Sequence, residues 1–251
     1  MNTKPEVARP VVAPGGPAAT AGPADRPLRR DAERNRRLIL SAARVVFAQR
    51  GLEASLDEVA KEAGLGVGTV YRRFPNRDAL IDALFDDMVA SIKEIIEEAA
   101  ALPRAWDGLV HFMTSMLESQ GRDKALRDVV LSRQKHLAES GRQKDDAVRD
   151  LVQPVLDTLI RRAQQEGDLR PDVALTDVGV LLIASVGVVE FTASADHDVW
   201  HRQFSVILDG LRARPDGAYT VLSPSPLDDE QMEVCMTGWK YGSQEARRER
   251  S

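Results

Sequence analysis

Apolar residues recur every three or four positions, the spacing of a helix face, along most of this 251-residue chain. No run of alternating β-branched residues predicts a strand, so the pattern predicts an all-α fold. Glycines, prolines and capping residues between the apolar stretches set the helix boundaries. Helices are expected over residues 31–50, 55–63, 67–74, 76–101, 104–120, 123–139, 142–166, 172–194 and 198–213, with a further short helix over 232–239.

The region from Ser55 to Arg77 differs from the rest because it contains two short helices and a tight connection. Ser55 and Glu58 form a capping-box pattern, which starts the first helix. The connection over 64–66 is about three residues long, the length found in a helix-turn-helix. The second helix carries hydroxyl groups and cations at Thr69, Tyr71, Arg72 and Arg73. A short polar helix supported by a small apolar one is typical of insertion into the DNA major groove.

Other interpretations of this region remain open from the pattern alone. A plain helical hairpin has the same capping box and glycine turn. In that case Arg72 and Arg73 lie on a solvated face, and Tyr71 packs its ring in the core.

Residues 34–80 resemble the DNA-binding domain of the TetR family of bacterial transcriptional regulators. The run A-G-x-x-x-G-T-x-Y-x-x-F, followed three positions later by a basic residue, is highly specific for that family. The resemblance implies an N-terminal three-helix helix-turn-helix domain, followed by a larger helical ligand-binding and dimerisation domain. The matching residues are Ile39, Ala42, Ala43, Phe47, Gly51, Leu56, Val59, Ala60, Ala63, Gly64, Gly68, Thr69, Tyr71, Phe74, Arg77 and Leu80.

Composition adds the expected domain limits. Residues 1–27 are rich in Pro, Gly and Ala and are expected to be disordered, because they cannot bury enough apolar surface to offset the entropy of ordering. The DNA-binding domain is expected over 28–78 and the ligand-binding and dimerisation domain over 79–214. The polar, proline-containing residues 215–251 are expected to be mostly disordered.

Charge is divided unevenly along a chain whose net charge is −5. Residues 26–77 contain twelve Lys/Arg and six Asp/Glu, whereas residues 78–251 carry a net charge of −11. A basic region on an acidic protein matches a nucleic-acid surface confined to one end. Six arginines open the basic region. Among them, Arg29 and Arg30 are candidates to reach phosphates or an adjacent minor groove, although such arginines can also serve solubility alone.

The resemblance implies phosphate contacts at three places. The hydroxyl groups of Thr69 and Tyr71 match phosphate-contacting positions of the family. Arg77 matches the family's usual phosphate-contacting lysine. Free N–H groups at the start of the recognition helix can also hold a phosphate. This start is formed by Gly66, Val67 and Gly68.

Base reading is expected from Arg72 and Arg73. An arginine that bonds guanine O6 and N7 provides a discrimination worth roughly 1–3 kcal/mol. The chain departs from the commoner family pattern on this face. Many members carry Ser or Lys where this chain has Gly66 and Val67, and His where it has Arg73. Val67 offers only apolar contact, for example to a thymine methyl group.

The helix expected over 172–194 is apolar nearly all round, so it is expected to be buried on every side. In the resembled family, the last two long helices pair with their copies across a two-fold axis as a four-helix bundle. The alternative is that both helices pack within one monomer. Glu190 lies beside the apolar run, and an interface ion pair and a ligand contact are both open for it. The predicted dimer interface consists of Leu182, Val186, Val189, Phe204, Ile207, Leu208 and Leu211.

Regulators of this family usually bury an apolar ligand pocket among their middle helices. A ligand there tilts the linker helix expected over 76–101 and separates the two DNA-reading domains. This requires only that the ligand prefer the non-binding geometry. Plain core packing is the alternative for each predicted lining residue. These residues are Trp106, Phe112, Met113, Met116, Leu117, Val130, His136 and Phe191.

Other classes of protein have little support in the sequence. A single cysteine, Cys235, excludes an internal disulfide and fits a reducing cytoplasm, and no signal peptide is expected. The apolar run 178–189 is shorter than a membrane span of about 20 residues. His197 and His201 have metal-ligand spacing but no third ligand, so neither a metal nor a cofactor is expected. No phosphate loop or nucleophile elbow indicates an enzyme.

The sequence therefore predicts a cytoplasmic, DNA-binding transcriptional regulator. It is expected to be a repressor that binds a near-palindromic operator as a homodimer and is released by a small-molecule effector of unknown identity. Its expected partners are double-stranded DNA, a second copy of itself and this effector, and no membrane. The alternative is an all-helical interaction or small-molecule-binding protein, or an enzyme, without operator-specific binding.

Overall fold

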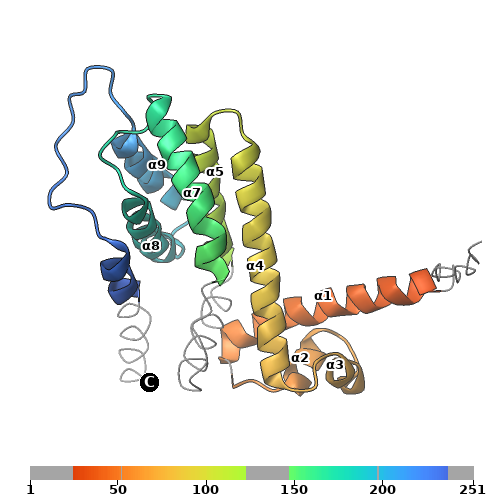
Figure 1. Ribbon diagram of the computed structural model, residues 1–251. Coiled ribbons are helices and arrows are strands. Elements are labelled where there is room, and N and C mark those ends of the chain that lie inside the picture. Colours follow the sequence, from red (N-terminus) through yellow and green to blue (C-terminus); the bar gives the residue numbers. More distant parts are fainter. Residues whose placement is uncertain (1–24, 52, 123–146, 197, 237–251) are drawn as a thin grey trace, which may run out of the picture. The chain divides into compact units, whose positions relative to one another are not determined.

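The computed structural model describes residues 25–51, 53–122, 147–196 and 198–236 (Figure 1). Within these residues the chain forms helices and no strand, apart from one isolated bridge between Leu169 and Arg212. The all-α prediction is therefore confirmed. The helices are α1 (Asp25–Arg50), α2 (Leu56–Glu62), α3 (Val67–Arg73), α4 (Arg77–Ala101), α5 (Ala105–Arg122), α7 (Ala147–Gln165), α8 (Leu175–Thr192) and α9 (Trp200–Leu211).

Most of these helices begin and end within a few residues of the predicted limits. The exception is α1, which begins at Asp25 instead of residue 31, so residues 25–27 are helical where disorder was expected. Pro27 is compatible with this first turn, because the first N–H groups of a helix have no intrahelical partner. The helix predicted over 123–139 lies outside the described residues.

A small apolar core joins α1, α2, α3 and the first turns of α4. The Ser55 hydroxyl accepts a hydrogen bond from Glu58 N at 3.3 Å, and Ser55 N donates to Glu58 Oε2 at 2.9 Å, as the capping-box pattern predicts. Gly64 has a φ of +65°, a left-handed conformation that suits glycine. The buried members of this core are Ile39, Leu40, Ala42, Ala43, Val46, Phe47, Ala54, Leu56, Val59, Ala60, Val70, Phe74, Leu80 and Leu84.

Helix α4 belongs to two cores. Asn76 caps it by accepting a hydrogen bond from Ala79 N at 2.8 Å. Leu80 and Leu84 pack with α1 to α3, whereas Ile92 and Ile96 pack in a second, larger core. The smaller core therefore extends past residue 78, where the sequence predicted the domain limit.

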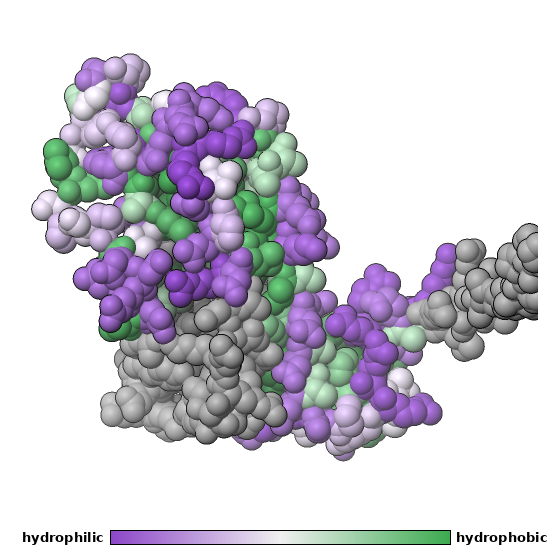
Figure 2. All heavy atoms as spheres, viewed as in Figure 1, coloured by the Kyte–Doolittle hydropathy of each residue, from purple (hydrophilic) through white to green (hydrophobic). Residues whose placement is uncertain are grey.

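The larger core is formed by α4, α5, α7, α8 and α9. Gly108 allows α4 and α5 to approach closely, since a Cβ there would lie 2.5 Å from the Ala99 carbonyl oxygen. On the side shown in Figure 2, polar residues cover much of the surface of this part, and apolar residues are visible between them. Fully buried members include Leu109, Phe112, Met113, Leu117, Leu159 and Leu169.

The chain beyond α9 has defined contacts where mostly disorder was expected. Ala213 N donates to Asp168 O at 2.9 Å, and Arg170 Nη2 donates to Thr220 O at 2.7 Å. A short helix covers residues 229–236, so it begins earlier than the predicted residue 232. These hydrogen bonds hold the segment next to the helices that precede it.

Candidate nucleic-acid interface

Helix α3 is held by one face and exposes the other. Val70 is fully buried and Phe74, at the end of the helix, is nearly so. Val67 and Tyr71 are 43% and 45% exposed, and Arg72 is exposed as well. Apolar packing beneath the helix therefore fixes its orientation, while the predicted DNA-reading side chains face solvent.

The three arginines near α3 differ in the partners that they bind within the chain. Arg72 Nη2 donates weakly to the Thr69 hydroxyl at 3.5 Å. Arg77 Nη1 forms an ion pair with Glu53 Oε2 at 2.7 Å. Arg73 is exposed and makes no hydrogen bond or ion pair within the described part of the chain. The guanidinium group of Arg73 is therefore the most available of the three for a ligand.

Glu53 is a participant that the sequence analysis missed. It lies 24 residues before Arg77, and its side chain is 89% exposed. No sequence pattern connects two residues so far apart. A DNA phosphate that binds Arg77 has to compete with the Glu53 carboxylate.

Electrostatic attraction also stabilises the N-terminal cap of α2. The hydrogen bond from the Ser55 backbone is the main cause that lowers the pKa of Glu58 below its ordinary value, and Arg50 adds a smaller attraction. Arg50 also forms an ion pair with Glu58. The carboxylate therefore stays ionised at the helix N-terminus, where a negative charge is favourable.

Three of the other predicted DNA contacts lie at exposed positions. Gly66 and Gly68 are exposed at the start of α3, and Thr69 is half-buried. Arg30 is exposed on α1, and the side chain of Arg29 lies outside the described part. Their positions are compatible with DNA contact, which stays a prediction.

The predicted ligand-lining residues are mostly part of the packed core. Each of Trp106, Phe112, Met113 and Leu117 is buried, and Met116 packs against the same core. These side chains are therefore packed in the larger core of the single chain, and their role in lining a ligand pocket stays a prediction. Val130 and His136 lie outside the described residues.

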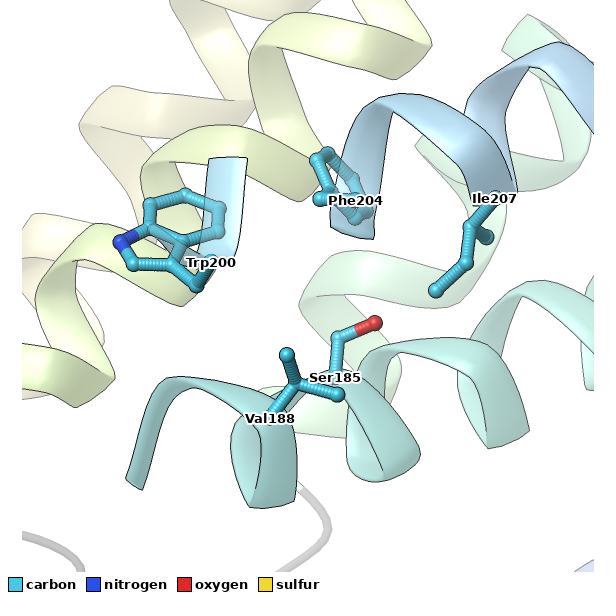
Figure 3. A pocket seen from close by; sticks show the side chains of 5 residues that line it. All are labelled: Ser185, Val188, Trp200, Phe204 and Ile207. Atoms are coloured by element: carbon cyan, nitrogen blue, oxygen red, sulfur yellow. The ribbon is translucent and has the colours of Figure 1, made fainter. Parts of the chain in front are cut away.

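Phe191 corrects the prediction of a lining residue, because it is 84% exposed on α8 and faces away from the core. A gap between α8 and α9 has no room for a water molecule (Figure 3). It is bordered by Ser185 and Val188 of α8 and by Trp200, Phe204 and Ile207 of α9. None of these residues belongs to the predicted lining.

The predicted dimer residues also face the interior of the single chain. Val186, Val189, Phe204 and Leu211 are buried, and Leu182, Ile207 and Leu208 pack against the same core. An all-apolar helix has no polar face to mark its orientation, so the sequence could not show which side points inward. The exposed large apolar residues of the α8–α9 region are Val180, Phe191, Val199 and Val206.

Helix α8 is the one helix in the described residues that is long and apolar enough to cross a membrane, judged by length and composition alone. It contacts α5, α7 and α9. Val178 and Val189 of this helix are buried in the larger core. Only 28% of its apolar stretch is buried, so the prediction that this helix is buried on every side is wrong for the single chain. Glu190 is exposed on it, and no group of metal-ligating residues occurs in the described part.

Comparison with known proteins agrees with this arrangement. The family described as "Bacterial regulatory proteins, tetR family" matches residues 39–84, and the family described as "Transcriptional regulator SbtR-like, C-terminal domain" matches residues 104–213. The first match contains the helix-turn-helix, and the second contains the described helices from α5 to α9.

Individual relatives match over different lengths. The crystal structure of a TetR transcription regulatory protein from Mycobacterium vanbaalenii is 33% identical, with a TM-score of 0.54, and the match covers 74% of this chain and 100% of that one. The HTH-type transcriptional regulator UidR of Escherichia coli K12 is 28% identical over 76% of this chain and 95% of its own. The uncharacterized HTH-type transcriptional regulator YhgD of Bacillus subtilis is 40% identical over 26% of this chain and 34% of its own. The chain therefore belongs to the TetR family of transcriptional regulators, which are not enzymes, and residues 39–84 are its DNA-binding helix-turn-helix.

Proposed function

We propose that this regulator is a homodimeric repressor that binds a near-palindromic operator and leaves it when a small molecule binds. The observation that carries the proposal is the orientation of α3. Val70 fixes the helix from below, while Val67, Tyr71 and Arg73 are exposed together. A helix fixed by one face and exposed on the other can enter the major groove without changing the fold.

Arg73 is the main base-reading residue in this proposal, with Arg72 as its neighbour. An unpaired exposed guanidinium group can bond guanine O6 and N7 without first breaking another bond. Arg72 has to break only its weak hydrogen bond to Thr69 before it can bind a base. Val67 offers a methyl surface to thymine.

Phosphate contacts surround this reading face. Thr69 and Tyr71 supply hydroxyl groups, and Arg77 supplies a cation once its bond to Glu53 is shared or broken. Arg29 and Arg30 extend the basic charge toward the N-terminus. The start of α3 adds the N–H groups of Gly66, Val67 and Gly68. These contacts set the register on DNA but carry no sequence information.

Dimerisation is proposed through the outer face of α8. Val180, Ala184, Gly187 and Phe191 follow one another at helical spacing, and all four are exposed. Phe191 leaves most of its ring in solvent in the single chain. Pairing with a second copy covers this apolar stripe, and Gly187 and Ala184 let the two helices approach closely. A two-fold dimer then presents two copies of α3 to successive faces of the DNA.

Release by a ligand is proposed to act through α4, the element shared by both cores. Arg44 of α1 forms an ion pair at 2.6 Å with Asp87 of α4, between the part of α4 in the first core and the part in the second. A shift of α4 therefore moves α1 as well. A ligand that enters beside Trp106 and Phe112 has to separate packed side chains, which favours such a shift.

Titration of the protein against the DNA that flanks its own gene tests the proposal. Fluorescence anisotropy is expected to show binding that prefers this DNA over scrambled DNA and weakens steeply with salt, because phosphate contacts release counterions. Binding that is equally weak on both sequences at every salt concentration would contradict a sequence-specific regulator of that region.

A further inference from the structure

The segment after α9 returns along the preceding helices and contacts both α7 and α8. It lies beyond residue 213, where the family match ends. Figure 1 shows it as a loop that leaves α9 and returns as a short helix on the side of α8. We propose that residues 214–236 form a latch over α7 and α8, and that release of the latch loosens the first half of α8.

Arg170 holds the base of the latch. This residue is only 8% exposed, and its Nε and Nη2 atoms bond both carboxylate oxygens of Asp172 at 2.7 and 2.8 Å. Nη2 also donates to Thr220 O at 2.7 Å, and the guanidinium carbon lies 4.6 Å from the centre of the Tyr219 ring. The backbone N–H of Arg170 donates to Leu211 O at 3.1 Å. One buried cation thus joins the α7–α8 connection, the end of α9 and the start of the latch.

Two further contacts of the latch reach two different helices. The Thr176 hydroxyl of α8 donates to Leu227 O at 2.8 Å. Arg149 of α7 lies 3.8 Å from Asp229, only two residues further along the latch. A groove between α7 and α8 has a volume of about 420 Å³ and is lined by Asp150, Gln153, Pro154, Asp157 and Leu175. Arg149 and Thr176 directly adjoin two of these lining residues in the sequence, so the latch lies beside the groove.

The tip of the latch is a short capped helix over residues 229–236. Gln231 N donates to Asp228 Oδ1 at 2.8 Å, and Asp228 N donates to Gln231 Oε1 at 3.1 Å, which is a reciprocal cap. The methyl group of Met232 occupies the space above Gly179 of α8. A Cβ at position 179 would lie 2.8 Å from this methyl carbon, so a larger side chain there requires the Met232 side chain to move.

Few buried contacts hold the latch against the helices. No residue from 214 to 236 belongs to the buried set, and Val221 and Val234 remain mostly exposed. The segment is therefore held mainly by polar contacts and one methionine, with little apolar area removed from water. Segments with few buried apolar contacts open at a lower free energy than the global unfolding of the protein.

Cys235 allows the test in the full-length protein, because it is the chain's single cysteine and is exposed on the latch helix. A nitroxide attached there is expected to show restricted motion by electron paramagnetic resonance. Gly179→Leu is expected to free the label by displacing Met232. It is also expected to speed hydrogen exchange in the first half of α8 by about tenfold or more, as for a local opening.

A second substitution separates displacement of the latch from general damage. Met232→Ala in the Gly179→Leu protein makes room for the leucine and is expected to restore both the slow label and the slow exchange. Thr176→Val, which removes only the bond to Leu227, is expected to give a smaller change in the same direction. A label that is already mobile in the unaltered protein, or one that Gly179→Leu leaves unchanged, overturns the latch, as does a failure of Met232→Ala to restore it. No DNA is used, so this result is independent of the proposed operator binding.

Discussion

Arg73 and Arg77 carry the same charge near α3 but are held differently. Arg73 has no hydrogen bond or ion pair in the described part of the chain, whereas Arg77 is bonded to Glu53 at 2.7 Å. A free guanidinium group is available to the groove, and a paired one has to exchange its partner. The two residues should therefore respond differently to mutation.

Arg73→Ala is expected to weaken operator binding by about 10- to 100-fold, the equivalent of one lost arginine–guanine pair. Binding to scrambled DNA should fall much less, because base contacts act only on the specific sequence. Anisotropy titrations on both DNAs measure the two losses. Arg161→Ala, which removes an exposed arginine of α7, is the control and should change neither. Equal losses on both DNAs would identify Arg73 as a phosphate contact.

Glu53→Gln is expected to strengthen binding to all DNA by several fold, because it removes a negative charge from the interface and frees Arg77. The dependence of the logarithm of affinity on the logarithm of salt concentration should steepen by up to about one unit. Glu94→Gln, an exposed carboxylate further along α4, is the matched control and should have little effect. Unchanged affinity and slope for Glu53→Gln would mean that Arg77 does not contact phosphate.

At the scale of elements, the sequence predicted how α8 would be composed but not which way it would face. Its small and large apolar residues are distributed all round, so Val186 and Val189 look as suitable for an interface as Val180 and Phe191. Only the neighbours of the helix decide the orientation. α5, α7 and α9 cover the side with Val186 and Val189, and they leave the side with Phe191 open.

Phe191→Asp is expected to raise the dimer dissociation constant by about 100-fold or more. Burying a phenylalanine stabilises an interface by roughly 1.5–3 kcal/mol, and the two-fold axis counts it twice. Light scattering over a dilution series measures the dissociation constant. The monomer should keep its helical content and melting temperature, because the ring is 84% exposed in the single chain. Val45→Asp on α1 is the control. An unchanged dimer would place the interface elsewhere.

The helix-turn-helix was the most predictable element, because its signals are local. The Ser55–Glu58 cap, the glycine turn and the Asn76 cap each lie within a few residues and are all present in the structure. The ligand domain gave no comparable signal. Trp106 and Phe112 have the composition of pocket residues, yet they are packed, because the same apolar side chains suit a cavity wall and a core.

At the scale of the whole molecule, the ends of α5, α7 and α9 are joined by ion pairs between distant residues. Arg104 Nη2 bonds both oxygens of Asp168 at 2.6 and 2.7 Å, across 64 positions. Arg212 Nη1 lies 3.5 Å from the same carboxylate, and its guanidinium carbon lies 4.3 Å from the centre of the Trp106 ring. Sequence patterns report neighbours along the chain, so neither these pairs nor the path of the chain after α9 could be predicted.

The ion pair between Arg170 and Asp172 should make part of the free energy of unfolding depend on pH. The hydrogen bond from Arg170 is the main cause that lowers the pKa of Asp172 below its ordinary value, and the same pair raises the pKa of Arg170. A carboxylate with a lowered pKa in the folded state stabilises the protein fully above its unfolded pKa of about 3.9. That contribution is lost as the pH falls through the lower, folded pKa. Arg170 stays charged throughout, so Asp172 alone sets this pH window.

Asp172→Asn is therefore expected to lower the free energy of unfolding at pH 7 by about 1–2 kcal/mol, between the values for exposed and fully buried pairs. Urea titrations at pH 7, 5, 4 and 3 measure the difference from the unaltered protein. This difference should be constant from pH 7 to 5 and shrink below about pH 4, where the unaltered protein also loses its charged Asp172. Asp157→Asn, which removes an exposed pair with Arg161 one helical turn away, is the control and should cost no more than about 0.5 kcal/mol. If the difference for Asp172→Asn stayed the same at pH 3, the substitution would act through packing instead of through the charge that Arg170 binds.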